Sequence, residues 1–149
     1  MLRPIRTLAL LALALAACDS PTESVTPVPG DPAVQRQVWE QQGIDDYRYV
    51  LGRNCFCANL LPRVQVDVRD GVVADVRDAR TGEPVDARRW DGVATVDQVF
   101  DAIADGVARG WDTDAQFHPE FGYPVAARIG DMSFDQGVSY SIEGLRRLD

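Results

Sequence analysis

The stretch that decides the fold runs from residue 64 to residue 76 and reads VQVDVRDGVVADV. Apolar and polar residues alternate on both sides of Asp70-Gly71, which is the pattern of two β-strands that each bury one face. An Asp-Gly pair between two such runs is a strong hairpin signal. We therefore predict a β-hairpin here.

The register of this hairpin depends on the length of its loop. A two-residue loop would place Asp75 opposite Val66, on the apolar face. A three-residue loop, 69–71, places Ala74 there instead. Because the buried face sets the register of a hairpin, we predict the three-residue loop, with Gly71 in the left-handed conformation.

Other strand and helix patterns extend on both sides of the hairpin. Asp31-Pro32 is typical of a helix start, and the first helix is predicted to stop at Gly43. A second helix is predicted after Thr95, which forms a capping box with Gln98. Strand patterns lie at 47–57, 116–118, 124–129 and 138–142. The order α-βββ-α-βββ predicts an α+β domain: an antiparallel sheet of about five to six strands with two helices on one face.

The N-terminus is predicted to be an export signal, residues 1–17. Arg3 and Arg6 precede an apolar run of about a dozen residues, shorter than the ~18 of a membrane-spanning helix. The sequence Leu15-Ala16-Ala17-Cys18 resembles the bacterial lipobox. This resemblance implies a diacylglyceryl group on Cys18 and cleavage before it. An ordinary signal for soluble export is the alternative.

Residues 18–32 are predicted to be the lipidated cysteine and a flexible tether, because the segment is rich in Pro, Ser and Thr and cannot bury much surface. A single domain is predicted over residues 33–149. Loss of residues 1–17 would leave 13 arginines against 23 acidic residues, a net charge of −10. Such an acidic chain argues against nucleic acid as a partner. We expect the domain to lie outside the cytoplasm, in the cell envelope.

Cys55 and Cys57 are the candidate functional residues of the domain, and three interpretations of the pair remain open. They form a local disulfide, which requires a bend because alternate residues of a flat strand have Cα atoms near the ~6.8 Å limit. They bind a soft metal, for which His118, the only histidine, would complete the ligands. Or they are two small buried residues of a strand.

The remaining residues form no catalytic constellation that we recognise. His118 precedes Pro119 and is predicted to lie at the surface or in a turn. Phe117, Phe121 and Tyr123 would either form an exposed loop for a partner or fold back into the core, and we favour the core. No motif for phosphate, Ca²⁺ or a zinc protease occurs. We assign no catalytic residue, metal site or cofactor.

Several segments together resemble a family of bacterial lipoproteins catalogued as domain of unknown function 6174. They are Trp39, residues 44–49, Cys55-Phe56-Cys57, residues 62–66, Asp70-Gly71 and residues 117–124. The resemblance implies an exported, often lipid-anchored domain. It implies no catalytic or binding residue.

The sequence therefore favours a non-enzymatic envelope lipoprotein, held to a membrane through Cys18, whose domain binds an envelope protein or has a structural role. The alternative is a thiol-redox or soft-metal protein that uses Cys55 and Cys57.

Overall fold

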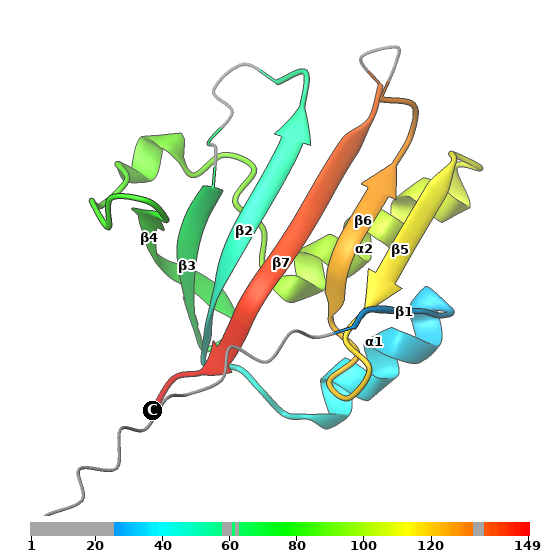
Figure 1. The fold of residues 1–149 in the computed structure, drawn as a ribbon, viewed down its shortest axis with the longest axis horizontal. Helices are drawn as coiled ribbons and strands as arrows, with labels where there is room; N and C mark the ends of the chain where they lie inside the picture. Colours follow the sequence, from blue (N-terminus) through cyan, green and yellow to red (C-terminus); the bar gives the residue numbers. More distant parts are fainter. Residues whose placement is uncertain (1–25, 58–60, 62, 133–135) are drawn as a thin grey trace, which may run out of the picture.

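The computed structural model describes residues 26–57, 61, 63–132 and 136–149. Within them the chain forms a sheet and two α-helices (Figure 1). The elements in chain order are β1 (Val28–Pro29), α1 (Pro32–Gln41), β2 (Tyr47–Cys55), β3 (Arg63–Arg69), β4 (Val72–Asp78), the 3-10 helix η1 (Ala87–Arg89), α2 (Val96–Ala108), β5 (Thr113–Phe117), β6 (Pro124–Ile129) and β7 (Val138–Arg147). The predicted signal, Cys18 and tether residues 19–25 lie outside the described residues.

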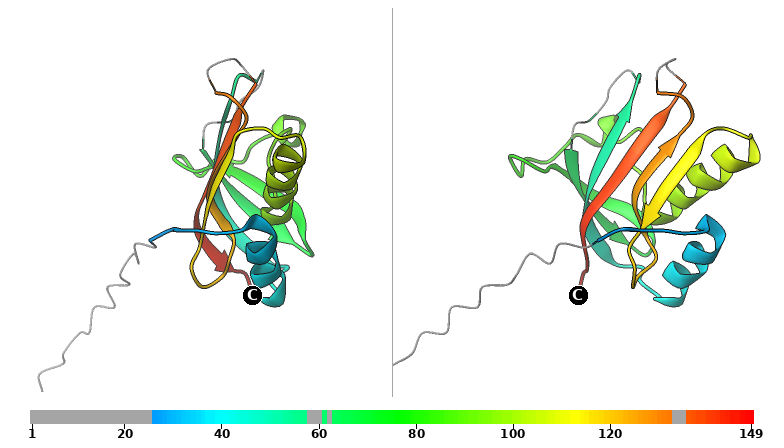
Figure 2. Two further views of the ribbon diagram at one scale, coloured as in Figure 1. Left: turned by 90° about the vertical axis from the view of Figure 1, so that its right-hand side faces the viewer. Right: turned by 45° about the vertical axis from the view of Figure 1, so that its right-hand side comes forward.

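The strands form one sheet in the order β1-β5-β6-β7-β2-β3-β4, and all neighbouring pairs are antiparallel. Both α-helices lie on the same face of this sheet (Figure 2). Strand β7, the last in the chain, joins the two halves because it pairs with β2 on one side and β6 on the other. The predicted α+β architecture is confirmed, with one strand more than expected.

The core lies between the sheet and the helices, and β2 shows how it is built. Tyr47, Tyr49 and Leu51 alternate into it and are at most 2% exposed. The Tyr49 hydroxyl donates to the carbonyl of Ala94, and the Tyr47 hydroxyl accepts the N–H of Val96 at 3.1 Å. Burial raises the pKa of Tyr47 to about 12, so this hydroxyl stays protonated at neutral pH. The two tyrosines therefore fix the start of α2 over β2.

Both helix starts agree with the sequence. The Asp31 side chain accepts hydrogen bonds from the N–H groups of Ala33 and Val34, and Pro32 is the first residue of α1. At α2, the Thr95 side chain accepts the Gln98 N–H while the Gln98 side chain accepts the Thr95 N–H. These bonds satisfy N–H groups that a helix start otherwise leaves unpaired.

The loop of the β3–β4 hairpin differs from the prediction. Arg69 pairs with Val72, so the loop contains only Asp70 and Gly71. Their φ angles are 49° and 73°. Positive φ at both positions is the type I′ turn, whose twist matches that of the strands it joins. The predicted three-residue loop is wrong, although Gly71 is left-handed as expected.

A β-bulge removes the conflict that led to the wrong register. Val68 pairs with Val73 but Asp67 pairs with Asp75, so Ala74 is an extra residue in β4. Beyond this bulge Val66 lies opposite Val76, and both side chains are fully buried. A single inserted residue exchanges the faces of a strand. The charge of Asp75 is thereby kept off the apolar face.

Residues 28–32 belong to the domain rather than to a free tether. Val28 and Pro29 pair with Phe117 and Gln116 at the edge of the sheet, and Asp31 caps α1. The domain therefore begins several residues before the predicted boundary at Ala33. A proline is compatible with an edge strand because one side of such a strand needs no backbone donor.

Candidate functional site at the end of strand β2

Strand β2 ends in an exposed disulfide, the candidate functional site. Cys55 is the last residue of the strand and the chain bends at Phe56. Cys55 and Cys57 form a disulfide with a Cα–Cα distance of 5.3 Å. The bend brings the two Cα atoms into the usual disulfide range of about 4.4–6.8 Å, which a flat strand barely permits. We call residues 55–57 the CFC tip.

The CFC tip presents its aromatic side chain to solvent. Phe56 is 70% exposed, the largest value among the exposed large apolar side chains of the described chain. Cys57 is exposed and Cys55 is half-buried. The tip lies at one end of the sheet, and β1, where the described chain begins, lies at the other (Figure 1). The disulfide joins no two elements, because it closes a loop within three consecutive residues.

Arg53 lies on the same face of β2 as Cys55. Alternate residues of a strand share a face, so Arg53 and Cys55 continue the inward row that contains Leu51. The pairing agrees, because Arg53 lies opposite Tyr140, which packs against the core, and Cys55 lies opposite Val138. At this end of the sheet the buried row thus changes from apolar side chains to a guanidinium and a sulfur.

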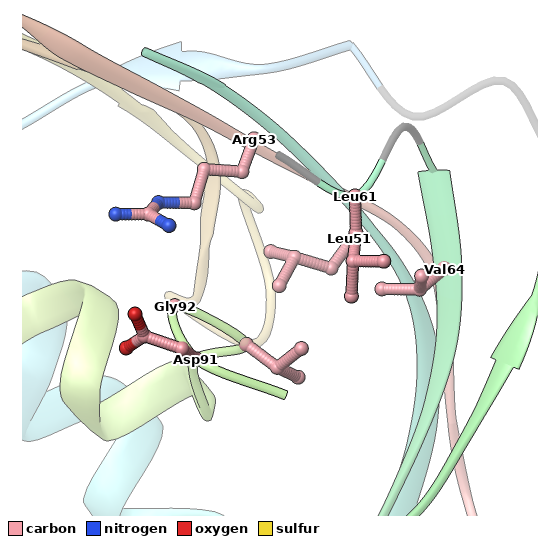
Figure 3. A pocket seen from close by; sticks show the side chains of 7 residues that line it. Leu51, Arg53, Leu61, Val64, Asp91 and Gly92 are labelled. Carbon is pink, nitrogen blue, oxygen red and sulfur yellow. The ribbon is translucent and has the colours of Figure 1, made fainter. Parts of the chain in front are cut away.

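The Arg53 guanidinium lies over the loop that precedes α2 (Figure 3). The φ angle of Gly92 in this loop is 81°, and a Cβ atom there would collide with the guanidinium. The Nε atom of Arg53 is buried and has no hydrogen-bond partner. The glycine is therefore required both by its own backbone conformation and by the close approach of Arg53.

The charge of Arg53 is not neutralised by an ion pair among the described residues. Figure 3 shows Asp91 on the guanidinium side of the loop, but none of the seven ion pairs of the described chain includes Arg53. The hollow beside Leu51, Leu61 and Val64 has a volume of about 10 Å³. Such a space holds about one water molecule, and Arg53 also lines a more open hollow of about 220 Å³ near the end of β2.

His118 lies in a turn, as the sequence indicates, but it is buried, with 8% exposure. Its Nδ1 atom accepts the N–H groups of Glu120 and Phe121 at 3.2 and 3.1 Å. Its ring lies between those of Phe121 and Tyr123, with centroids 4.9 and 4.8 Å away. Phe117 and Tyr123 are 0% and 4% exposed, which confirms that these aromatic residues fold into the core.

The structure does not bring His118 to the cysteines. His118 follows β5 at the end of the sheet opposite the CFC tip (Figure 1). Within the described ranges there is no group of three or more His, Cys, Asp or Glu residues that could hold a metal ion. The metal site considered from the sequence is therefore not assembled from these residues.

Two open grooves lie elsewhere on the domain. One, of about 590 Å³, is lined by residues of the 118–123 turn and of β7, including His118, Ser141 and Glu143. The His118 Nδ1 atom holds the turn, and Glu143 pairs with Arg63 across the sheet. The other, of about 480 Å³, lies between α1 and α2 and is mainly apolar. His118 and Glu143, the ionisable residues that line the first groove, are thus engaged in contacts within the domain.

Arg53 is the residue that sequence reasoning missed. The alternation of β2 continues through Arg53 to Cys55, so a strict reading of the strand period would have placed both on the inner face.

Cys18 lies outside the described residues. None of the described helices is both long enough and apolar enough to span a bilayer.

No curated protein and no solved structure matches the chain. A family of unknown function (DUF6174) matches residues 32–147, from the first residue of α1 to the last residue of β7. Because this match covers most of the chain, the protein belongs to the family of unknown function DUF6174.

Proposed function

We propose that the protein is an exported lipoprotein, held to a bacterial membrane by lipid on Cys18, whose domain binds a protein partner in the envelope through the CFC tip. The anchor is supported by the lipobox-like residues 15–18 and the short apolar run before them. A lipobox cysteine carries at least two acyl chains, and two chains are enough for stable membrane attachment.

The exposure of Phe56 is the observation that carries the binding role. A ring that is 70% exposed contributes little to the core. Aromatic residues are enriched at the centres of protein interfaces, where a few of them supply much of the affinity. The disulfide holds the backbone on both sides of Phe56, which lowers the entropy lost when the ring is buried by a partner.

The position of the tip suits a tethered domain. The nine residues of β2 span on the order of 30 Å at about 3.3 Å each. A chain that reaches the domain at β1 therefore leaves the CFC tip at the end of the sheet far from the attachment point. A partner could reach Phe56 there without contact with lipid.

Two measurements test this proposal. Cys18→Ala should move the protein from the membrane fraction to the soluble envelope fraction, and unchanged membrane retention would refute the anchor.

For the tip, a photocrosslinking amino acid at position 56 should give one defined adduct in the native envelope. The same probe at Val34, which is 54% exposed on α1, is the matched control. Phe56→Ser should weaken binding of the identified partner at least tenfold; equal crosslinking at both positions, or unchanged affinity, would refute the tip as the binding site.

Thiol–disulfide exchange is a second candidate function, favoured by the geometry of the disulfide. Its stabilising effect is small, because a loop of three residues restricts the unfolded chain very little. Its Cys57 end is exposed, and exposed disulfides are the ones that exchange readily. Thiol counting on the protein from its native envelope, with and without reductant, tests this role. Two thiols that are already free and unreactive before reduction would exclude it.

A further inference from the structure

We propose that Cys57 is the sulfur that a protein dithiol attacks at the CFC tip, and that Arg53 makes Cys55 the leaving thiolate. This inference rests on the second candidate function and assigns roles to the two cysteines and to a third residue. Cys55 and Cys57 would be the reacting residues, and Arg53 a positioning residue that acts through its charge.

Accessibility distinguishes the two sulfurs. Cys57 lies beyond the end of β2 and is exposed, whereas Cys55 is half-buried and lies opposite Val138 of β7. Exchange requires the attacking thiolate to approach along the line of the disulfide bond, so access to the attacked sulfur limits the rate. The exposed Cys57 is open to such an approach, while the sheet covers one side of Cys55.

Electrostatics favours the same assignment. Arg53 lies two residues before Cys55 on the same face of β2, and the ion pairs of the described chain do not include it. A nearby guanidinium stabilises a thiolate and lowers its pKa below the ordinary value of about 8.5. A thiol of lower pKa is the better leaving group. Cys57, beyond the bend at Phe56, does not continue the inward row that holds Arg53.

Among the described residues, no carboxylate forms an ion pair with the Arg53 guanidinium. Asp91 lies across the hollow on the loop before α2, but it is exposed to solvent and forms no ion pair with Arg53 (Figure 3). Tyr140 lies opposite Arg53 on β7 and brings no carboxylate to it. The Arg53 Nε atom is buried without a partner, so part of the guanidinium lacks both water and a counter-charge.

The exchange takes place in two steps. A thiolate of the partner attacks the Cys57 Sγ atom, the Cys55–Cys57 bond breaks, and its electron pair passes to the Cys55 Sγ atom. The second thiol of the partner loses its proton and attacks the partner sulfur of the mixed disulfide, which releases Cys57 as a thiolate. Two electrons pass from the partner dithiol to the CFC tip, and protons lost by the partner thiols are taken up by the released cysteines or by solvent. The substrate class is thus an envelope protein with two neighbouring thiols.

Glutathione is the probe that identifies the attacked sulfur. The full-length protein, purified in detergent, is mixed with reduced glutathione and quenched early with excess iodoacetamide. Trypsin releases residues 54–63, and fragmentation on either side of Phe56 shows which cysteine carries glutathione and which is alkylated. We expect glutathione on Cys57 at least threefold more often than on Cys55. Each pKa unit of the leaving thiol is worth about threefold at a Brønsted slope of about 0.5.

Three variants separate charge from structure. Arg53→Gln should slow adduct formation about threefold and reduce the preference for Cys57, while Arg53→Lys should keep most of both. Arg80→Gln, which removes a charge from the exposed turn after β4, is the matched control and should behave as wild type. An adduct shared equally between the cysteines or found mainly on Cys55, or an Arg53→Gln variant identical to wild type, would overturn the inference. If no adduct forms at all, thiol exchange itself fails as a function, and binding at Phe56 is tested independently.

Discussion

Two short segments that follow strands at opposite ends of the sheet both carry aromatic side chains, yet they are built differently. In the 118–123 turn after β5, His118 is 8% and Tyr123 is 4% exposed. In the CFC tip after β2, Phe56 is 70% exposed. The first segment is part of the core, and the second only borders it.

The neighbours of each segment explain the difference. Tyr123 packs edge-on against Trp39 of α1, with ring centroids 6.1 Å apart. A Cβ atom at Gly122 would meet the Gln35 carbonyl and the Val38 side chain, so the turn lies directly against the same helix. Among the described residues, strand β7 lies beside the CFC tip, where Cys55 pairs with Val138. An aromatic side chain in a loop is therefore structural where a helix covers it and is available for binding where none does.

The largest expected effect is a difference in the free energy of unfolding between variants at the buried Tyr123 and the exposed Phe56. Tyr123→Ala should lower the free energy of unfolding by about 3–5 kcal/mol, because it removes a buried aromatic ring and leaves a cavity. Phe56→Ala should change it by less than about 0.5 kcal/mol, as is usual for an exposed position. Equilibrium urea unfolding measures both. Comparable losses in the two variants would show that Phe56 is packed in solution.

His118 provides the next largest effect. His118→Ala should cost about 1–3 kcal/mol, because the N–H groups of Glu120 and Phe121 lose their shared acceptor. His118→Asn is the control, since its side-chain oxygen can replace Nδ1 and should restore part of the loss. Urea unfolding is again the measurement. If alanine and asparagine are equally destabilising, packing of the ring rather than its Nδ1 atom stabilises the turn.

The disulfide of the CFC tip should contribute less to the free energy of unfolding than the 118–123 turn does. The double variant Cys55→Ser/Cys57→Ser should lose no more than about 1.5 kcal/mol, the loop-closure value for three residues. Reduction of the wild-type protein should give a similar shift in the urea midpoint. A loss as large as that of Tyr123→Ala would mean that the CFC tip is a structural staple, contrary to its proposed role.

The smallest expected effect lies on the sheet between the two segments. The hydrogen bond that Arg48 donates to Asp67 is the main reason why the pKa of Asp67 lies below its ordinary value of 3.8. A carboxyl whose pKa is lowered on folding adds stability above that ordinary value and loses it as the pH falls through the lower folded value. Asp67→Asn should therefore cost at most about 1 kcal/mol at pH 7, and this difference from wild type should shrink below about pH 4. Urea unfolding at pH 3 and pH 7 tests it, and a difference independent of pH would contradict it. The same pH comparison should leave Phe56→Ala unaffected.

The sequence by itself determined the local elements of this protein. The period-two alternation of 64–76, the Asp31 cap and the Thr95–Gln98 capping box each depend on residues close together in the chain, and each predicted element is present. These patterns are also enough for the α+β class, because amphipathic helices and half-buried strands must cover one another. Cys55 and Cys57 were likewise recognisable as the candidate pair.

Only the tertiary structure decided features that depend on residues far apart in the chain. The bulge at Ala74 is tolerable because it lets Val66 and Val76 face the core together, and no local pattern encodes it. The strand at Val28–Pro29 exists because β5 offers an unpaired edge. The setting of Arg53 requires Gly92, 39 positions later, to pass beneath its guanidinium. Local propensity fixes which backbone conformations form, whereas packing decides their register and which side chains remain available for function.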